Sequence, residues 1–184
     1  MTPDQNLEAV TPGSPLLPRR TVVSDIVPIE VPANQEIHPG KDLEDFVTFF
    51  VEDQLFGIPI ILVQDILSPE TIASIPLAPP EVKGSINLRG RIVTVIDVRV
   101  CLGLAKRDDE EDKGMAVTVE HQHELYTLLV DRVGGVIGIG KDSFERNPGT
   151  LGANWREFAN GIYRLENGLM VVLDVKRLLD IKKH

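Results

Sequence analysis

The chain has 184 residues, and 28 acidic against 19 basic side chains give it a formal net charge of −9. This charge has the wrong sign for nucleic acid or an anionic membrane surface, and no apolar run approaches the roughly 20 residues that span a bilayer. The N-terminus lacks the basic and apolar regions of a signal peptide. Cys101, the single cysteine, excludes an internal disulfide and fits a reducing compartment. These features predict a soluble cytoplasmic protein.

Residues 1–43 differ in composition from the rest of the chain. They hold seven of the thirteen prolines and show no sustained helical or strand period. Such a segment is predicted to be a disordered or extended tail, with 22–23 and 26–31 as stretches that can dock in extended form. Residues 44–184 are expected to fold.

The folded part is predicted to begin with a hairpin, in which the strands 46–51 and 55–58 flank a polar turn. Residues 61–67 are predicted to form a helical turn that leads into a strand. Four prolines then mark a loop: Pro69, Pro76, Pro79 and Pro80. A single helical turn is expected over 80–83, because proline suits the first helical position and Gly84 ends the turn.

Residues 84–102, GSINLRGRIVTVIDVRVCL, form the segment around which the chain is organised. A strand over 86–88 and a turn at Gly90 lead into 92–96, whose β-branched residues predict a strand buried on both faces. Asp97 stands where an N-cap belongs, before one apolar helical turn.

The same pattern recurs without a gap over 161–179, where Asp174 takes the place of Asp97. A terminal helix is predicted over 175–181. Between the two copies lie a charged run predicted to be a solvated linker, a second hairpin, a strand and a loop. Their ranges are, in order, 106–113, 115–120 with 124–131, 133–139 and 141–160. In the second hairpin Tyr126 takes the place of Phe56. The fold class predicted is therefore all-β, built from two copies of one motif.

The chain offers few candidates for catalysis or metal binding. Asp97 and Asp174 suggest a hydrolase in which two carboxylates share a proton, but each precedes valine and a basic residue, which favours helix capping. His121 and His123 lack the further ligands of a metal site. The glycines between 134 and 140 do not belong to a phosphate-binding loop. No enzyme activity, cofactor or metal is predicted.

The pattern Asn87-Leu88-Arg89-Gly90-x-Ile92-Val93-x-Val95-Ile96-Asp97-Val98-Arg99 resembles the CheW-like family. This family comprises bacterial chemotaxis coupling proteins and the regulatory domain of the CheA histidine kinase. Further matches lie at 56–58, 63–66, 82–84, 130–133 and 161–179, so the resemblance spans about 45–182. The departures are conservative: Thr94 for proline, Val98 for leucine, Phe56 for tyrosine and Asp65 for glutamate.

The resemblance implies two five-stranded SH3-like β-barrels with a few short helices, and strands that can be exchanged between the barrels. It implies a non-catalytic adaptor between the cytoplasmic tip of a chemoreceptor and the regulatory domain of a CheA-type kinase, recruited to receptor arrays. An adaptor of a related pathway, such as one controlling pili, is an alternative. The kinase is expected to bind the exposed end of a barrel.

The receptor groove implied by the resemblance lies between the subdomains. The matching positions are Val63, Asp65, Gly84, Arg89 and Val133. On the residues alone, the alternatives to a binding role for Arg89 are a solvated turn charge and an internal pair with an acid such as Asp65. Core packing is the alternative for Val63.

Overall fold

A computed structural model describes residues 42–69, 71–107, 113–146, 151, 153–166 and 168–180. The strands are β1 (Leu43–Val51), β2 (Gln54–Pro59), β3 (Val63–Leu67), β4 (Val82–Leu88), β5 (Arg91–Asp97), β6 (Met115–His121), β7 (Glu124–Val130), β8 (Arg132–Gly140), β9 (Phe144–Glu145), β10 (Ala159–Leu165) and β11 (Gly168–Leu173). The helical segments are η1 (Ile60–Leu62), α1 (Val98–Cys101), η2 (Lys141–Ser143), α2 (Ala153–Arg156) and α3 (Val175–Asp180). Most of the predicted tail and linker lies outside the described residues.

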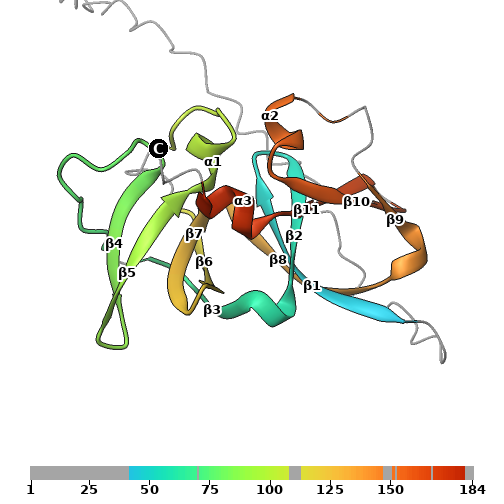
Figure 1. Ribbon diagram of the computed structural model, residues 1–184, viewed down its shortest axis with the longest axis horizontal. Coiled ribbons are helices and arrows are strands. Elements are labelled where there is room, and N and C mark those ends of the chain that lie inside the picture. The colour runs from blue at the N-terminus through green and yellow to red at the C-terminus, as the bar shows by residue number, and fades with distance from the viewer. Residues whose placement is uncertain are drawn as a thin grey trace, which may run out of the picture.

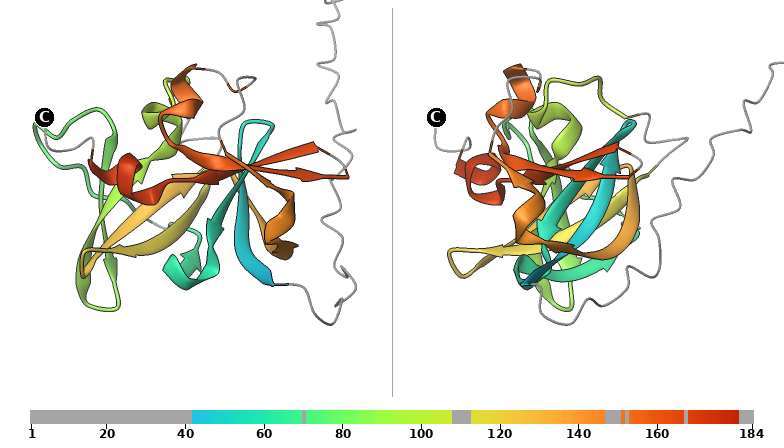
Figure 2. Two further views of the ribbon diagram at one scale, coloured as in Figure 1. Left: turned by 45° about the vertical axis from the view of Figure 1, so that its right-hand side comes forward. Right: turned by 90° about the vertical axis from the view of Figure 1, so that its right-hand side faces the viewer.

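The strands form two sheets, which confirms the all-β prediction. The first sheet has the order β8-β1-β2-β11-β10-β9 and the second the order β3-β6-β7-β5-β4. In Figure 1 the second sheet occupies one end of the long axis, with β4 at its edge, and β9 lies at the other end. The first sheet thus combines the N-terminal hairpin with the C-terminal copy of the motif, while the second holds the middle of the chain. Figure 2 shows the same division from two other sides. The SH3-like barrel form of each sheet stays a prediction.

The internal repeat extends from the sequence to the strand pairing. β11 runs parallel to β2 and β5 runs parallel to β7, with Val171 opposite Phe56 and Thr94 opposite Tyr126. Val171 and Thr94 occupy the same position in the two copies of the motif. Each copy of the motif therefore pairs with its own hairpin at the equivalent residue, so the repeat includes the hairpins as well.

The largest hydrophobic cluster takes residues from both sheets and lies between them. Phe49 of β1 and Leu128 of β7 belong to it, whereas Phe50 belongs to a smaller cluster of the first sheet. Successive side chains of a strand point to opposite faces. Residues 46–51 of β1 are apolar apart from Thr48 because both faces of this part of the strand are covered. The shared cluster holds the two sheets together through burial of apolar surface.

Several local predictions are wrong for identifiable reasons. Ile92, predicted to be buried, is 75% exposed because β5 leaves the core at its N-terminal end. Val82 begins β4 instead of lying within a helical turn over 80–83. Its N–H donates to the Pro79 carbonyl in a tight turn, with the nitrogen 3.0 Å from the oxygen. The predicted loop 141–160 contains η2, β9 and α2.

Candidate functional site

Arg89 lies at the turn between β4 and β5 and forms an ion pair with Asp65 of β3. Its Nη2 atom is 2.9 Å from Asp65 Oδ2. Asp65 also accepts a hydrogen bond from the Ile66 N–H. The side chain of Arg89 is 82% exposed and that of Asp65 is 24% exposed. The internal pair with Asp65 thus forms, and the guanidinium of Arg89 still faces solvent.

Val63 and Val133 occupy corresponding positions in the two sheets. Val63 pairs with Val119 of β6, and Val133 pairs with Phe49 of β1. Val119 and Phe49 in turn lie opposite Tyr126 and Phe56, the equivalent residues of the two hairpins. Both valines are half-buried and pack against the shared core. They therefore lie at the margin of the contact between the sheets, where a groove is expected.

Gly84 is buried and belongs to the packing of the second sheet. Its φ is 154°, and a Cβ atom would overlap the Ala73 carbonyl oxygen and lie 2.8 Å from Ile72 Cγ2. Ala73 forms two backbone hydrogen bonds with Ser85, the residue after Gly84. The absence of a side chain thus permits the loop after β3 to pack on β4. A role of Gly84 in receptor binding stays a prediction.

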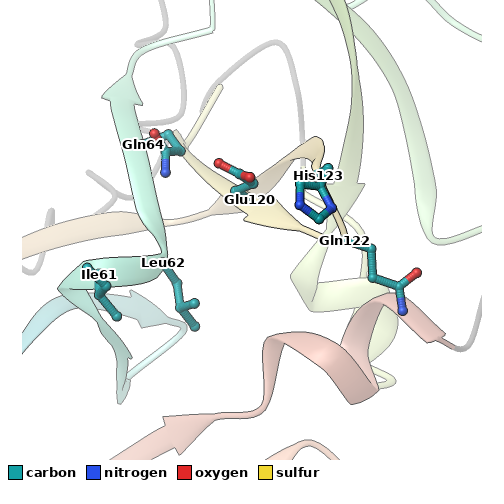
Figure 3. A pocket seen from close by; sticks show the side chains of 6 residues that line it. All are labelled: Ile61, Leu62, Gln64, Glu120, Gln122 and His123. Carbon is teal, nitrogen blue, oxygen red and sulfur yellow. The ribbon is translucent and has the colours of Figure 1, made fainter.

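A shallow depression of about 340 Å³ lies beside Val63, between β3 and the turn of the second hairpin. Figure 3 shows its lining residues: Ile61, Leu62, Gln64, Glu120, Gln122 and His123. Ile61 is 82% exposed. The sequence assigns this residue only to a helical turn, although the three consecutive apolar residues after Pro59 are a signal of an apolar surface. Among the described residues, no group of three or more His, Cys, Asp or Glu side chains can hold a metal ion.

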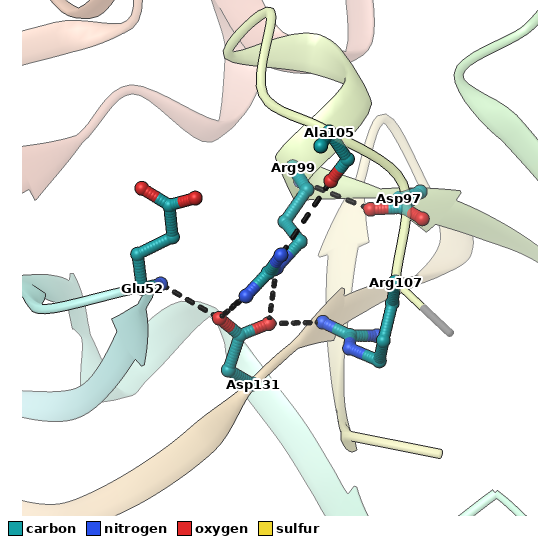
Figure 4. Close-up of polar contacts among 6 residues, drawn as sticks. All are labelled: Glu52, Asp97, Arg99, Ala105, Arg107 and Asp131. Atoms are coloured by element: carbon teal, nitrogen blue, oxygen red, sulfur yellow. Dashed lines mark hydrogen bonds and ion pairs between the residues drawn. The ribbon is translucent and has the colours of Figure 1, made fainter. Parts of the chain in front are cut away.

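Asp131 is the centre of a buried charge cluster at the junction of β7 and β8 (Figure 4). Its carboxylate accepts hydrogen bonds from Arg99 Nε at 2.8 Å and Nη2 at 2.7 Å, from the Glu52 N–H at 2.6 Å, and from Arg107. Burial raises the pKa of Asp131, but the hydrogen bonds from Arg99, Arg107 and Glu52 outweigh it and lower the pKa to about 2. The hydrogen bond with Asp131 raises the pKa of Arg99.

The Asp131 cluster ties together segments that are distant in the sequence. It joins the turn after β1, helix α1 and the loop after α1 to the start of β8. Arg107, predicted to be part of a solvated linker, is 7% exposed. The charge run itself does not indicate this contact, because the acidic partner, Asp131, lies 24 residues further along the chain.

Asp97 and Asp174 each accept a hydrogen bond from the first turn of the helix that follows. Asp97 Oδ1 is 3.0 Å from the Arg99 nitrogen, and Asp174 Oδ1 is 3.0 Å from the Arg177 nitrogen. Both carboxylates are engaged as caps, which satisfies backbone N–H groups that lack a partner within the helix. This geometry gives no support to the hydrolase hypothesis.

No helix among the described residues is long and apolar enough to cross a membrane. The curated relatives include the chemotaxis protein CheW of Treponema pallidum, 26% identical over 140 residues, which cover 74% of this chain and 82% of that protein. CheW of Helicobacter pylori is 27% identical over 150 residues, covering 82% and 90% of the two chains. Protein PilI of Pseudomonas aeruginosa is 26% identical over 125 residues, covering 68% and 70%.

The fold also resembles a solved structure, the crystal structure of the scaffolding protein TtCheW from Thermoanaerobacter tengcongensis. The TM-score is 0.68 at 28% sequence identity, and the match covers 77% of this chain and 96% of that one. The family model of the CheW-like domain matches residues 45–183. This range contains both copies of the motif, both hairpins and the Asp131 cluster. The chain therefore belongs to the CheW-like domain family.

Proposed function

We propose that this protein is a non-catalytic adaptor that couples chemoreceptors to a CheA-type histidine kinase. Membership of the CheW-like family and the relatives named for chemotaxis support this role. The observation that carries it is the exposed guanidinium of Arg89, held in place by Asp65. The protein would act in the cytoplasm and be recruited to receptor arrays.

The geometry suits an amphipathic helix as the receptor segment. The apolar stripe of such a helix would pack on Ile61, Leu62 and Val63, which lie together beside the contact between the sheets. A carboxylate of the helix would bind Arg89, which donates only through Nη2 to Asp65 among the described residues. Charge-assisted hydrogen bonds of this kind fix orientation as well as adding affinity.

An adaptor of a chemosensory pathway that controls pili is a second candidate. The similarity to PilI of Pseudomonas aeruginosa favours it. The two candidates share the fold and the mode of binding and differ in the receptor and kinase. Calorimetric titration of the full chain with the regulatory domains of the chemotaxis and pilus-type kinases of the same organism distinguishes them, because the cognate domain alone should bind with saturation.

Replacing Arg89 with glutamate is expected to weaken binding to receptor cytoplasmic fragments by at least about tenfold, the effect of roughly 1.4 kcal/mol. The substitution removes the cation and places a second carboxylate beside Asp65. The melting temperature should change little, because exposed ion pairs contribute only about 0–1 kcal/mol. Co-sedimentation with receptor fragments measures the binding, and thermal unfolding measures the stability.

Arg91→Glu is the matched control, since Arg91 is an exposed arginine on the same hairpin. It makes the same change in net charge and should leave receptor binding within about twofold, because its cation is not paired with Asp65. Equal losses for both variants would indicate a general charge effect. A large fall in melting temperature for Arg89→Glu alone would show that the pair with Asp65 is structural.

A further inference from the structure

An apolar cavity of about 250 Å³ opens onto the smaller hydrophobic cluster of the first sheet. Phe46, Tyr163 and Val172 belong to both the cavity lining and this cluster, and Pro59 and Phe144 complete the apolar lining. The ring centroids of Phe46 and Phe144 each lie 5.3 Å from that of Tyr163, and Phe144 is 37% exposed. Since an apolar cavity of about 150 Å³ holds a benzene molecule, this aromatic cavity has room for one branched aliphatic side chain.

The N-terminal part of the chain meets the fold at the rim of this cavity. Asp42, the residue before β1, is tied to Lys141, which lines the cavity. The Lys141 N–H donates to the Asp42 carbonyl at 3.3 Å, and Lys141 Nζ lies 3.1 Å from Asp42 Oδ2. In Figure 1, β1 begins at the same end of the molecule as β9, which contributes Phe144. Residues 1–41 are therefore attached beside an apolar surface that is open to solvent.

Residues 26–31, IVPIEV, have the composition that such a surface accepts. They hold four branched aliphatic side chains around Pro28, and Pro32 follows them directly. Proline restricts a chain to extended conformations, and extended segments that contain proline dock in grooves lined by aromatic rings. The segment is thus matched to the cavity by shape and by chemistry.

The connection to β1 is long enough for the segment to reach the cavity of its own molecule. The ten residues 32–41 span up to about 36 Å when extended. A short flexible connection of this kind gives the tethered segment an effective concentration on the order of millimolar. A contact that is weak between separate molecules can therefore be well populated within one chain.

We propose that residues 26–31 fold back onto the first sheet of the same molecule and insert Ile29 into this cavity. A protein that binds this face has to displace the segment, so docking lowers the apparent affinity of such a partner by the fraction of chains in which the cavity is occupied. The tail then acts as a built-in competitor for this face of the first sheet. This inference goes beyond the proposed adaptor function and does not depend on it.

Nuclear magnetic resonance of the isotope-labelled full chain tests the proposal. The Ile29 methyl groups are expected to show nuclear Overhauser effects to the rings of Phe144 and Tyr163. The amides of residues 26–31 should have order parameters above about 0.6, the value below which a backbone is flexible. Flexible amides throughout 26–31, or contacts of Ile29 with another surface, would overturn the proposal.

One substitution on each side of the contact should release the segment. Ile29→Ser removes the side chain that enters the cavity, and it lies outside the folded core, so it should leave the melting temperature close to that of the wild type. Asn160→Arg places a long charged side chain at the cavity from an exposed position. Both variants should lose the contacts with Phe144 and Tyr163, and the order parameters of 26–31 should fall below about 0.6.

Ile37→Ser is the matched control, because it makes the same change in the connection to β1 and should leave docking intact. Release of the segment by Ile37→Ser, or docking that persists in Asn160→Arg, would contradict insertion of Ile29 into the cavity. A mixture of labelled and unlabelled chains separates docking within one molecule from exchange between two. Contacts between labelled and unlabelled chains would show that the segment of one copy occupies the cavity of another, which also overturns the proposal.

Discussion

Replacing Asp131 with asparagine is expected to lower the free energy of unfolding by about 3–5 kcal/mol, the usual effect of removing one partner from a buried ion pair. The side chains of Arg107 and Asp131 are 3% and 8% exposed. The variant keeps the shape of the side chain but loses the charge that Arg99 and Arg107 share. Because a domain is stable by only about 5–15 kcal/mol, urea denaturation should show a much lower midpoint.

The pH dependence of this effect follows from the pKa of Asp131. The pKa is about 2 in the folded protein, below the ordinary value of 3.8 that the unfolded chain keeps. The stabilisation by the carboxylate is therefore fully present above about pH 4 and is lost as the pH falls toward 2. The difference in unfolding free energy between wild type and Asp131→Asn should be constant near neutral pH and shrink below about pH 4.

Asp53→Asn is the control for the same change of side chain. Asp53 lies exposed on the turn after β1, next to Glu52, whose N–H binds Asp131. We expect the unfolding free energy of this variant to match that of the wild type to within about 0.5 kcal/mol, as is usual for surface substitutions. If Asp131→Asn behaved in the same way, the charge cluster would contribute nothing to stability.

The sequence predicts those parts of the fold that local patterns encode. The hairpins, the strand before Asp97 and the repeat ending at Asp174 all depend on alternation, turn residues and capping within short stretches. The burial of Arg107 and the exposure of Ile92 depend on segments far away in the chain. A charge run is typical of a linker unless the position of a distant partner is known. A β-branched run predicts a strand, but it does not show which end of that strand lies outside the core.

The candidate site was predictable in part. Arg89 and Asp65 follow from the resemblance. Their pairing was an open alternative, because no local pattern shows that the turn between β4 and β5 meets β3, which lies at the other end of the strand order of its sheet. Ile61 gave a weaker signal, the three consecutive apolar residues after Pro59.

Gly84→Ala is expected to destabilise the protein by about 3 kcal/mol or more. A non-glycine residue in an unfavourable backbone region costs about 1–3 kcal/mol, and forcing an extra methyl group into a packed site costs about 1–3 kcal/mol more. At Gly84 the φ is 154° and the new Cβ would overlap the Ala73 carbonyl oxygen. Relief of this overlap requires the loop after β3 to move away from β4, with loss of the hydrogen bonds between Ala73 and Ser85.

Gly90→Ala separates the two contributions. Gly90 lies on the same hairpin with a φ of 86°, and a Cβ there meets nothing within 4 Å. Its substitution should cost about 1 kcal/mol, from the backbone conformation alone. Urea denaturation measures the loss of unfolding free energy for both variants. The additional loss for Gly84→Ala is then the contribution of the packing of Ala73 and Ile72 on β4. Equal effects at both positions would contradict a steric requirement at Gly84.

The same pair of variants tests the predicted place of Gly84 in the receptor groove. A buried glycine offers a partner no side chain, so its effect on binding is expected to act through the packing of the loop on β4. Receptor binding by Gly84→Ala should therefore recover at temperatures well below its midpoint, where the fold is populated. A binding defect that persists in the fully folded variant would show instead that the receptor approaches the backbone at this position.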